Sequence, residues 1–190
     1  MSFLRFATTA AWTDTVLTDF DTFLQDHAAA EKKASGMAVS MLSHYPDRTE
    51  LVRSMADLAI EEMQHFREVV KLIYARGGTL GDDQKDEYIN QFRKAFRRGT
   101  EVYFLDRLLV AGIIEARGCE RFGLVAEALP TGDLKQFYDA ITRSEARHHE
   151  LFIELAERYF TANVVQGRLD ELLDFEANIV AELPLRVALH

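Results

Sequence analysis

The sequence predicts an all-α protein built as a bundle of long helices, and three observations predict it. Apolar residues recur every three or four positions over long stretches, which is the period of an amphipathic helix. No alternating apolar pattern or β-hairpin dipeptide competes with this interpretation. The 190 residues contain only ten Gly and three Pro, and all three prolines lie where the periodicity stops. Because these two residue types interrupt helices, we expect the helices to be long.

Four stretches carry the periodicity and define the expected bundle. They cover residues 13–44, 47–77, 100–129 and 133 to about 160, and Pro46 and Pro130 end the first and the third. Asp47 and Glu50 have the three-residue spacing of a capping pair at the start of the second stretch. A helix of about 30 residues is a rod of roughly 40 Å.

Two further segments complete the predicted architecture. Residues 79–99 are polar and too long for a turn between antiparallel neighbours, so they predict a crossover between the second and third long helices. A short helix is expected within it over 83–96. Residues 161–190 predict an extra C-terminal helix, over 169–183, packed on the outside of the bundle.

Composition bounds the class of protein. With 48% hydrophobic and 28% charged residues, the chain fits one globular domain over residues 1–190. Its single cysteine, Cys119, excludes an intrachain disulfide and a CxxC site, which indicates a reducing cytoplasm. No apolar run approaches the length of about 18 residues that a membrane span needs, and the N-terminus does not have the pattern of a signal peptide. We therefore expect a cytoplasmic protein with no membrane partner.

Two Glu-x-x-His pairs lie on different expected helices. They are Glu62 with His65 and Glu145 with His148, and the members of each pair share a helical face because they are three residues apart. Both faces are otherwise apolar. An unpaired buried charge costs several kcal/mol, so these groups require a partner or a metal ion.

The other two long helices each supply one further carboxylate on an apolar face. The interval from Glu31 to Glu62 is 31 positions and that from Glu115 to Glu145 is 30, which indicates a two-fold pseudo-repeat of helix pairs. One Glu from each of two helices, with Glu-x-x-His from each of the other two, is the ligand set of dinuclear iron or manganese sites in ferritin-like bundles. The predicted fold is therefore a ferritin-like four-helix bundle.

Six metal ligands, which are also the candidate catalytic residues, follow from this pattern: Glu31, Glu62, His65, Glu115, Glu145 and His148. Four carboxylates and two imidazoles suit two Fe ions with positions left open for O2, whereas the absence of thiolates disfavours a structural zinc site. A lone Glu-x-x-His is usually a solvated pair, so the prediction rests on the combination.

Some neighbouring residues are set apart from the ligands. Glu61 and Glu120 break the matched spacing, and His149 points about 100° away from the residue before it, so we place His149 at the rim of the site. His27 lies one turn before Glu31 and is interpreted as a hydrogen-bonded core histidine rather than a ligand.

Basic residues are concentrated in one run and beside the ligands. The run contains Arg93, Lys94, Arg97 and Arg98. The others are Lys32, Lys33, Arg117, Arg121, Arg143 and Arg147. A solvated crossover face and pairing with nearby acids are the plain explanations, and contacts to a phosphate backbone are the functional alternative.

Four aromatic residues share the ligand faces, namely Phe66, Phe122, Tyr138 and Phe152. They are candidates for an apolar substrate pocket, although aromatic residues at helical spacing are more often simple core.

At the ligand positions the sequence resembles the family of ferritin-like di-iron hydroxylases that act on 2-methylthio-N6-isopentenyladenosine in tRNA. The similarity spans residues 10–165 and is carried by HAAAEKKASG at 27–36, EEMQHF at 61–66, IEARGCERF at 114–122 and SEARH at 144–148. The ligands that the family's motifs imply are the same six that spacing selects.

The resemblance implies an O2-dependent monooxygenase that hydroxylates an allylic methyl of the isopentenyl group. Its substrate would be a tRNA anticodon loop with the target base splayed out. Electrons would come from an external reductase or ferredoxin-type donor, because the chain has no cysteine cluster and no GxGxxG motif.

The alternative function is a ferritin-like protein that handles iron or reduces peroxide. Peroxide reduction by the rubrerythrin route requires a four-cysteine module, which one cysteine cannot supply. The formal charge of −9 argues against binding nucleic acid by bulk electrostatics. Four of the glutamates are assigned to metal, whose positive charge offsets part of this net charge, and basic residues gather at 93–98. We therefore expect tRNA binding to be local and modest in affinity.

Overall fold

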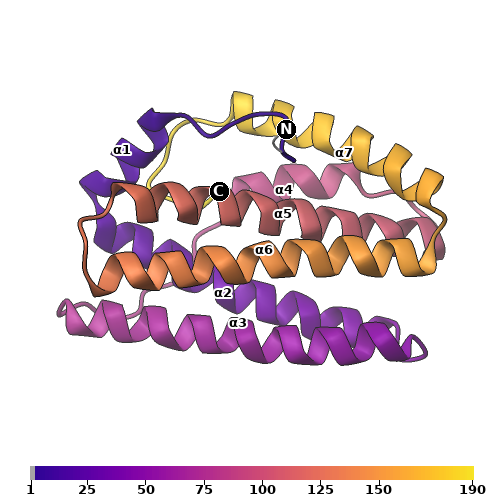
Figure 1. Cartoon of the computed structure of the whole chain (residues 1–190), viewed down its shortest axis with the longest axis horizontal. Coiled ribbons are helices and arrows are strands. Elements are labelled where there is room, and N and C mark those ends of the chain that lie inside the picture. Colours follow the sequence, from indigo (N-terminus) through magenta and orange to yellow (C-terminus); the bar gives the residue numbers. More distant parts are fainter. Residues whose placement is uncertain (1–2) are drawn as a thin grey trace. The chain divides into compact units, whose positions relative to one another are not determined.

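A computed structural model describes residues 3–190, which form seven α-helices, one 3-10 helix and no strand (Figure 1). The helices are α1 (Ala10–Thr18), α2 (Phe20–His44), α3 (Thr49–Ala75), α4 (Glu87–Phe92), η1 (Arg93–Ala95), α5 (Thr100–Ala128), α6 (Asp133–Tyr159) and α7 (Ala162–Glu182). The predicted all-α class is confirmed. Within the described residues, no helix has the length and apolar character needed to cross a membrane.

Three of the predicted boundaries were wrong, and so was the capping pair predicted at Asp47, because α3 begins at Thr49 after Arg48 and has no side-chain cap. The helix expected over 13–44 is divided at Asp19, whose side chain caps α2 by accepting a hydrogen bond from the amide of Thr22 at 3.1 Å. The crossover helix begins only after Asp86, which caps α4 in the same way. The C-terminal helix begins at Ala162 rather than at 169. The sequence pattern did not predict its first two turns because most of their residues are exposed and show no apolar periodicity.

The chain divides into two compact units, and residues Asp14–Lys85 with Arg186–Leu189 form one of them, here called unit 2. Its core is the pair of helices α2 and α3. The Ser35 hydroxyl donates to the carbonyl of Ala59 at 2.8 Å, and Asp21 pairs with Arg76, so the two helices run antiparallel. The C-terminal segment joins this unit where the amide of Leu189 donates to Asp26 at 2.6 Å.

Unit 1 comprises the residues up to Thr13, Asp86–Leu185 and His190. Its core is the antiparallel pair α5 and α6, which come close at Gly112, where an added Cβ would lie 3.2 Å from that of Phe152. His149 fixes the same crossing because its Nδ1 lies 2.8 Å from the carbonyl oxygen of Gly112. Each unit thus contains one long helical hairpin, as the predicted pseudo-repeat requires.

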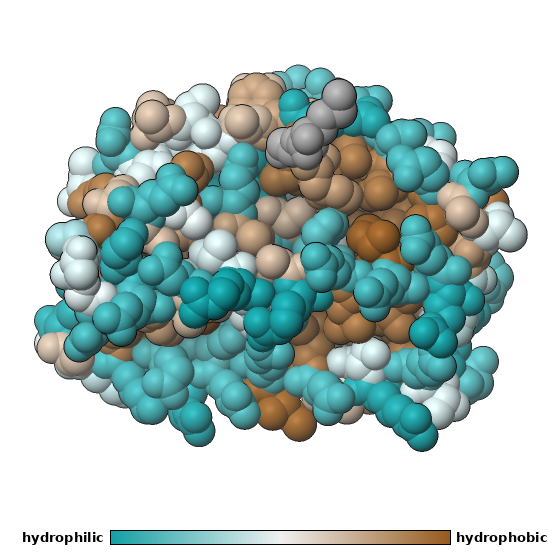
Figure 2. Space-filling view, in the orientation of Figure 1, coloured by the Kyte–Doolittle hydropathy of each residue, from teal (hydrophilic) through white to brown (hydrophobic). Residues whose placement is uncertain are grey.

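The segments outside the hairpins match the predicted crossover and extra helix. Residues 76–99 connect α3 to α5 and contain α4 and η1, and α7 packs against α4 and α5 within unit 1. Figure 2 shows hydrophilic side chains over most of the visible surface. A single domain over residues 1–190 stays a prediction.

Candidate metal centre

Unit 2 brings together three of the six predicted ligands. Glu31 projects from α2, and Glu62 and His65 project from α3. His65 Nδ1 lies 3.5 Å from Glu31 Oε2 and 3.3 Å from Glu62 Oε2. The potential ligand atoms of the three side chains lie within 4.8 Å of one another, and both carboxylates are buried. The trio is therefore compact enough to bind an ion.

The charge of this trio shows in the protonation of His65. Burial by itself lowers the pKa of the imidazole, but the hydrogen bonds and negative charges of Glu31 and Glu62 outweigh burial and raise that pKa to about 10. In the absence of metal, a protonated His65 thus partly neutralises the charge of the two buried carboxylates.

Glu31 has a second histidine beside it. His27 Nε2 lies 2.6 Å from Glu31 Oε1, and both side chains are buried. His27 is one turn before Glu31 on α2, which is the spacing at which helical side chains meet. The interpretation of His27 as a hydrogen-bonded core residue agrees with this contact.

Unit 1 brings together the other three predicted ligands. Glu115 projects from α5, and Glu145 and His148 project from α6, and all three are buried. Their potential ligand atoms lie within 4.8 Å of one another, with His148 Nδ1 3.7 Å from Glu145 Oε2. Gly118 leaves room next to this trio, since a Cβ there would lie 3.9 Å from Glu145 Oε2.

The donor atoms of both trios fit iron. Each trio offers two carboxylates and one imidazole, which are the oxygen and nitrogen donors that Fe and Mn prefer, and neither includes a thiolate. Buried carboxylates are costly unless a cation answers them. The residues present therefore fit the metal that the ligand pattern predicts.

Residues set apart from the ligands have other contacts. Glu120 accepts hydrogen bonds from Thr8 and Arg117. His149 bonds the Gly112 carbonyl and packs its ring against that of Phe3 at 4.1 Å. These contacts give Glu120 and His149 structural roles, and we now assign His149 to the helix crossing.

The basic run divides into exposed and anchored residues. Arg93, Lys94 and Arg98 are exposed on η1 and the segment after it. The guanidinium of Arg97 instead binds the fully buried Asp106, at 2.7 Å for the shortest contact. Arg97 thus has a structural role that sequence reasoning missed, because its partner lies in the next helix.

The basic residues near the ligands divide in the same way. Arg117 and Arg121 are buried, and Arg117 pairs with Glu120 and Glu176, which agrees with the plain explanation of pairing with nearby acids. Lys32 pairs with Asp83 at 2.8 Å and Lys33 donates to the carbonyl of residue 84, which holds the crossover against α2. Arg143 and Arg147 of α6 are exposed to solvent, so a phosphate contact stays a prediction for these two residues.

Three of the four residues of the candidate aromatic pocket are core residues. Phe122, Tyr138 and Phe152 are at most 1% exposed, and the rings of Phe122 and Tyr138 lie 5.8 Å apart. Phe66 is half-buried on α3. The plain explanation therefore holds for the three residues of unit 1.

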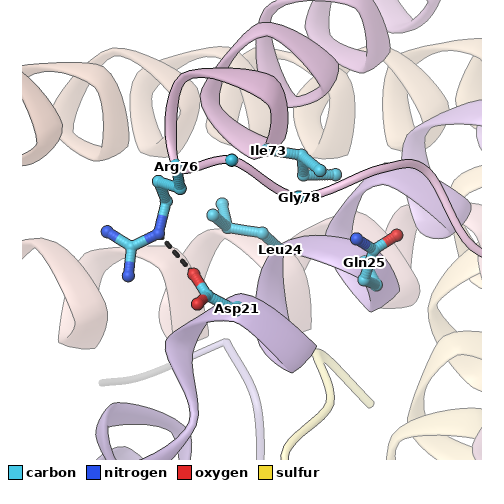
Figure 3. A pocket seen from close by; sticks show the side chains of 7 residues that line it. Asp21, Leu24, Gln25, Ile73, Arg76 and Gly78 are labelled. Carbon is cyan, nitrogen blue, oxygen red and sulfur yellow. Dashed lines mark hydrogen bonds and ion pairs between the residues drawn. The ribbon is translucent and has the colours of Figure 1, made fainter.

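A pocket of about 230 Å³ lies between the ends of α2 and α3, away from the ligands in sequence (Figure 3). Its polar groups bind one another: Arg76 pairs with Asp21, and the Gln25 amide exchanges hydrogen bonds with Thr79 and Gly81. We assign no ligand to it.

Comparison with known proteins identifies the family. The family model described as tRNA-(MS[2]IO[6]A)-hydroxylase (MiaE) matches residues 1–190. The chain belongs to the MiaE family. This is a family of tRNA-modifying hydroxylases, as the resemblance at the ligand motifs predicts.

Curated relatives carry one name. The tRNA 2-(methylsulfanyl)-N(6)-isopentenyladenosine(37) hydroxylase of Pseudomonas putida is 35% identical over 158 residues, which are 83% of this chain and 77% of the relative. The protein of the same name from Salmonella typhimurium is 31% identical over 155 residues, 82% of this chain but only 56% of the relative.

Among solved structures, this MiaE family member is similar to "Protein 43 with aldehyde deformylating oxygenase activity from Synechococcus". The two are 34% identical, with a TM-score of 0.94 over 100% of this chain and 96% of the other. The predicted ferritin-like fold is confirmed.

Proposed function

We propose that this protein is an O2-dependent hydroxylase of the isopentenyl group of 2-methylthio-N6-isopentenyladenosine in tRNA. The observation that carries the proposal is the match of the MiaE family over the whole chain, together with two carboxylate-histidine trios whose donor atoms suit iron. The curated relatives are named for this substrate.

The six predicted ligands would hold two iron ions. Glu31, Glu62 and His65 form one trio, and the other three ligands form its counterpart in the pseudo-repeat. When bound, the iron pair would supply the oxidising power that C–H hydroxylation with O2 requires. That both trios serve one pair of ions is a proposal that rests on the ferritin-like ligand pattern.

The protein's own residues contribute binding and orientation. The buried carboxylates supply negative charge that favours oxidised iron, and the exposed Arg93, Lys94 and Arg98 provide cations for a tRNA backbone. A cytoplasmic reductase or ferredoxin-type partner would supply the electrons, because this chain contains no cysteine cluster that could bind an iron–sulfur centre.

The deciding experiment is a nucleoside assay. Iron-loaded protein is incubated with O2, a reductant system and tRNA that carries the prenylated nucleoside, and the digested nucleosides are analysed by mass spectrometry. We expect a product about 16 mass units heavier than the prenylated nucleoside, which is the mass of one oxygen atom. Protein that retains its iron and yields no such product would overturn the proposed function and leave the fold unaffected.

A second candidate is deformylation of an aldehyde. It is favoured by one observation, the 34% identity over 100% of this chain with a solved protein that is named for that activity. Incubation of the same iron-loaded protein with a long-chain aldehyde, followed by analysis of formate and hydrocarbon, separates the two functions. The iron-handling alternative predicts turnover of neither substrate.

A further inference from the structure

His27 makes a strong contact with a predicted ligand. Its side chain is 0% exposed, and its Nε2 lies 2.6 Å from Glu31 Oε1. An ionised carboxylate offers only acceptors, so the imidazole must be the donor. A hydrogen bond to an ionised acceptor is roughly twice as strong as one between neutral groups.

The two oxygens of Glu31 therefore have different neighbours. Oε1 accepts from His27, while Oε2 lies 3.5 Å from His65 Nδ1, on the side of the trio. Rotation of the carboxylate that exchanged the two oxygens would break and remake the bond to His27. The contact thus restricts the carboxylate to orientations in which one oxygen is held by the imidazole and the other is presented to the trio.

The equivalent position in unit 1 differs. Four residues before Glu115 stands Ala111, a buried residue with no polar atom in its side chain. His27 is therefore specific to one half of the pseudo-repeat, and a single substitution there can distinguish the two halves.

We propose that His27 is a positioning residue, which holds Glu31 Oε1 so that Oε2 is presented as a metal ligand through one oxygen. This inference rests on the proposed metal centre. Contacts of this kind orient metal ligands, and their loss typically lowers metal affinity by about 10- to 100-fold.

The test compares two substitutions in the full-length protein. His27→Leu removes the donor at similar volume, and His27→Gln retains an N–H donor. Anaerobic titration with Co²⁺, followed by visible absorption, reports affinity, stoichiometry and coordination number. We expect His27→Leu to weaken the binding of one of the two Co²⁺ ions by about 10- to 100-fold and to change the spectrum of that ion. His27→Gln should retain most of the affinity.

His44→Gln is the matched control, because His44 lies exposed on the same helix and its ring bonds Ser40 rather than a candidate ligand. It should bind Co²⁺ like the unmodified protein. Melting of each metal-free variant verifies folding, and His27→Ala replaces His27→Leu if the latter does not fold.

Each outcome decides between the proposals. Unchanged affinity in His27→Leu, or equal losses in His27→Leu and His27→Gln, would overturn the positioning role while the metal centre stands. An unmodified protein that binds no Co²⁺ or iron would overturn the metal centre and the positioning role together. Metal binding that follows the expected order without any hydroxylated nucleoside would overturn the proposed function alone.

Discussion

At the scale of single side chains, the candidate ligands are buried charged groups. The four candidate ligand carboxylates are between 1% and 6% exposed, in helices whose other buried residues are mostly apolar. Charges in such positions are costly and persist where a cation answers them. The buried Asp106 and Glu176 are paired with arginines, whereas the candidate ligands are grouped with histidines and with one another, and this difference sets them apart.

Glu115 is the candidate ligand best suited to test the proposed metal centre. We expect Glu115→Ala to lower the iron content, measured by elemental analysis, and to abolish hydroxylation, because the trio of unit 1 loses one of two carboxylates. Glu127→Ala is the control, since Glu127 is exposed on the same helix. Unchanged iron in Glu115→Ala would show that Glu115 is not a ligand.

At the scale of elements, a buried hydrogen-bond network around Arg117 joins α5 to its neighbours in unit 1. Arg117 is 0% exposed and its Nε donates to Glu176 of α7 at 2.8 Å. Tyr88 of α4 donates to the same carboxylate at 3.1 Å, and the carbonyl of Phe6 accepts from Arg117 at 2.8 Å. The N-terminal segment, α4 and α7 are therefore fixed to the helix that carries Glu115.

Glu176→Gln should destabilise the protein strongly, because the buried guanidinium of Arg117 loses its fully buried carboxylate partner and keeps only the partly exposed Glu120. The expected loss in free energy of unfolding is about 3–5 kcal/mol, measured by urea unfolding. Glu171→Gln is the control: its partner Arg168 is held by Asp106 as well, and Glu171 is exposed, so the loss should be below about 1 kcal/mol. Similar losses in the two variants would contradict a stabilising role of the buried pair of Arg117 and Glu176.

Asp106 joins two elements to α5 and gives a pH-dependent prediction. Burial raises the pKa of its carboxyl group, but hydrogen bonds from Arg97 and Arg168 outweigh burial and hold that pKa below its usual value. A depressed carboxyl pKa stabilises the fold above the unfolded pKa, and this contribution is lost as pH falls through the folded pKa.

Asp106→Asn should therefore lower the free energy of unfolding by about 3 kcal/mol at neutral pH. The difference from the unmodified protein should shrink below about pH 4, the usual carboxyl range. Urea unfolding at several pH values measures it. A difference that stays constant down to pH values well below this range would show that charge is not the cause.

At the scale of the whole molecule, charge is distributed unevenly. The net charge of −9 disfavours nonspecific binding of nucleic acid, yet three exposed basic residues lie close together in sequence, at 93, 94 and 98. Any tRNA binding should thus be local and depend on a few phosphate contacts.

Charge reversal tests this surface. The triple variant Arg93→Glu, Lys94→Glu and Arg98→Glu should weaken tRNA binding and lower its salt dependence by roughly one unit of slope per lost phosphate contact. Arg97 is left in place because its loss would disturb Asp106. The control is Arg67→Glu, exposed on α3. Equal affinity and equal salt slope in the triple variant would assign the basic run to a solvated surface.

The sequence by itself determined the helical class, the pseudo-repeat and the identity of the six candidate ligands, because helical period places residues three and four apart on one face. It also identified the family through the same motifs. These features are local, and local spacing is sufficient to predict them.

Only the tertiary structure decided which polar residues bind one another. The break at Asp19, the burial of Arg117 and the anchoring of Arg97 on Asp106 depend on partners that helical period does not specify. The 2.6 Å contact of His27 with one oxygen of Glu31 is a matter of side-chain orientation. Spacing places residues on a face, but the packing of side chains decides which atoms meet.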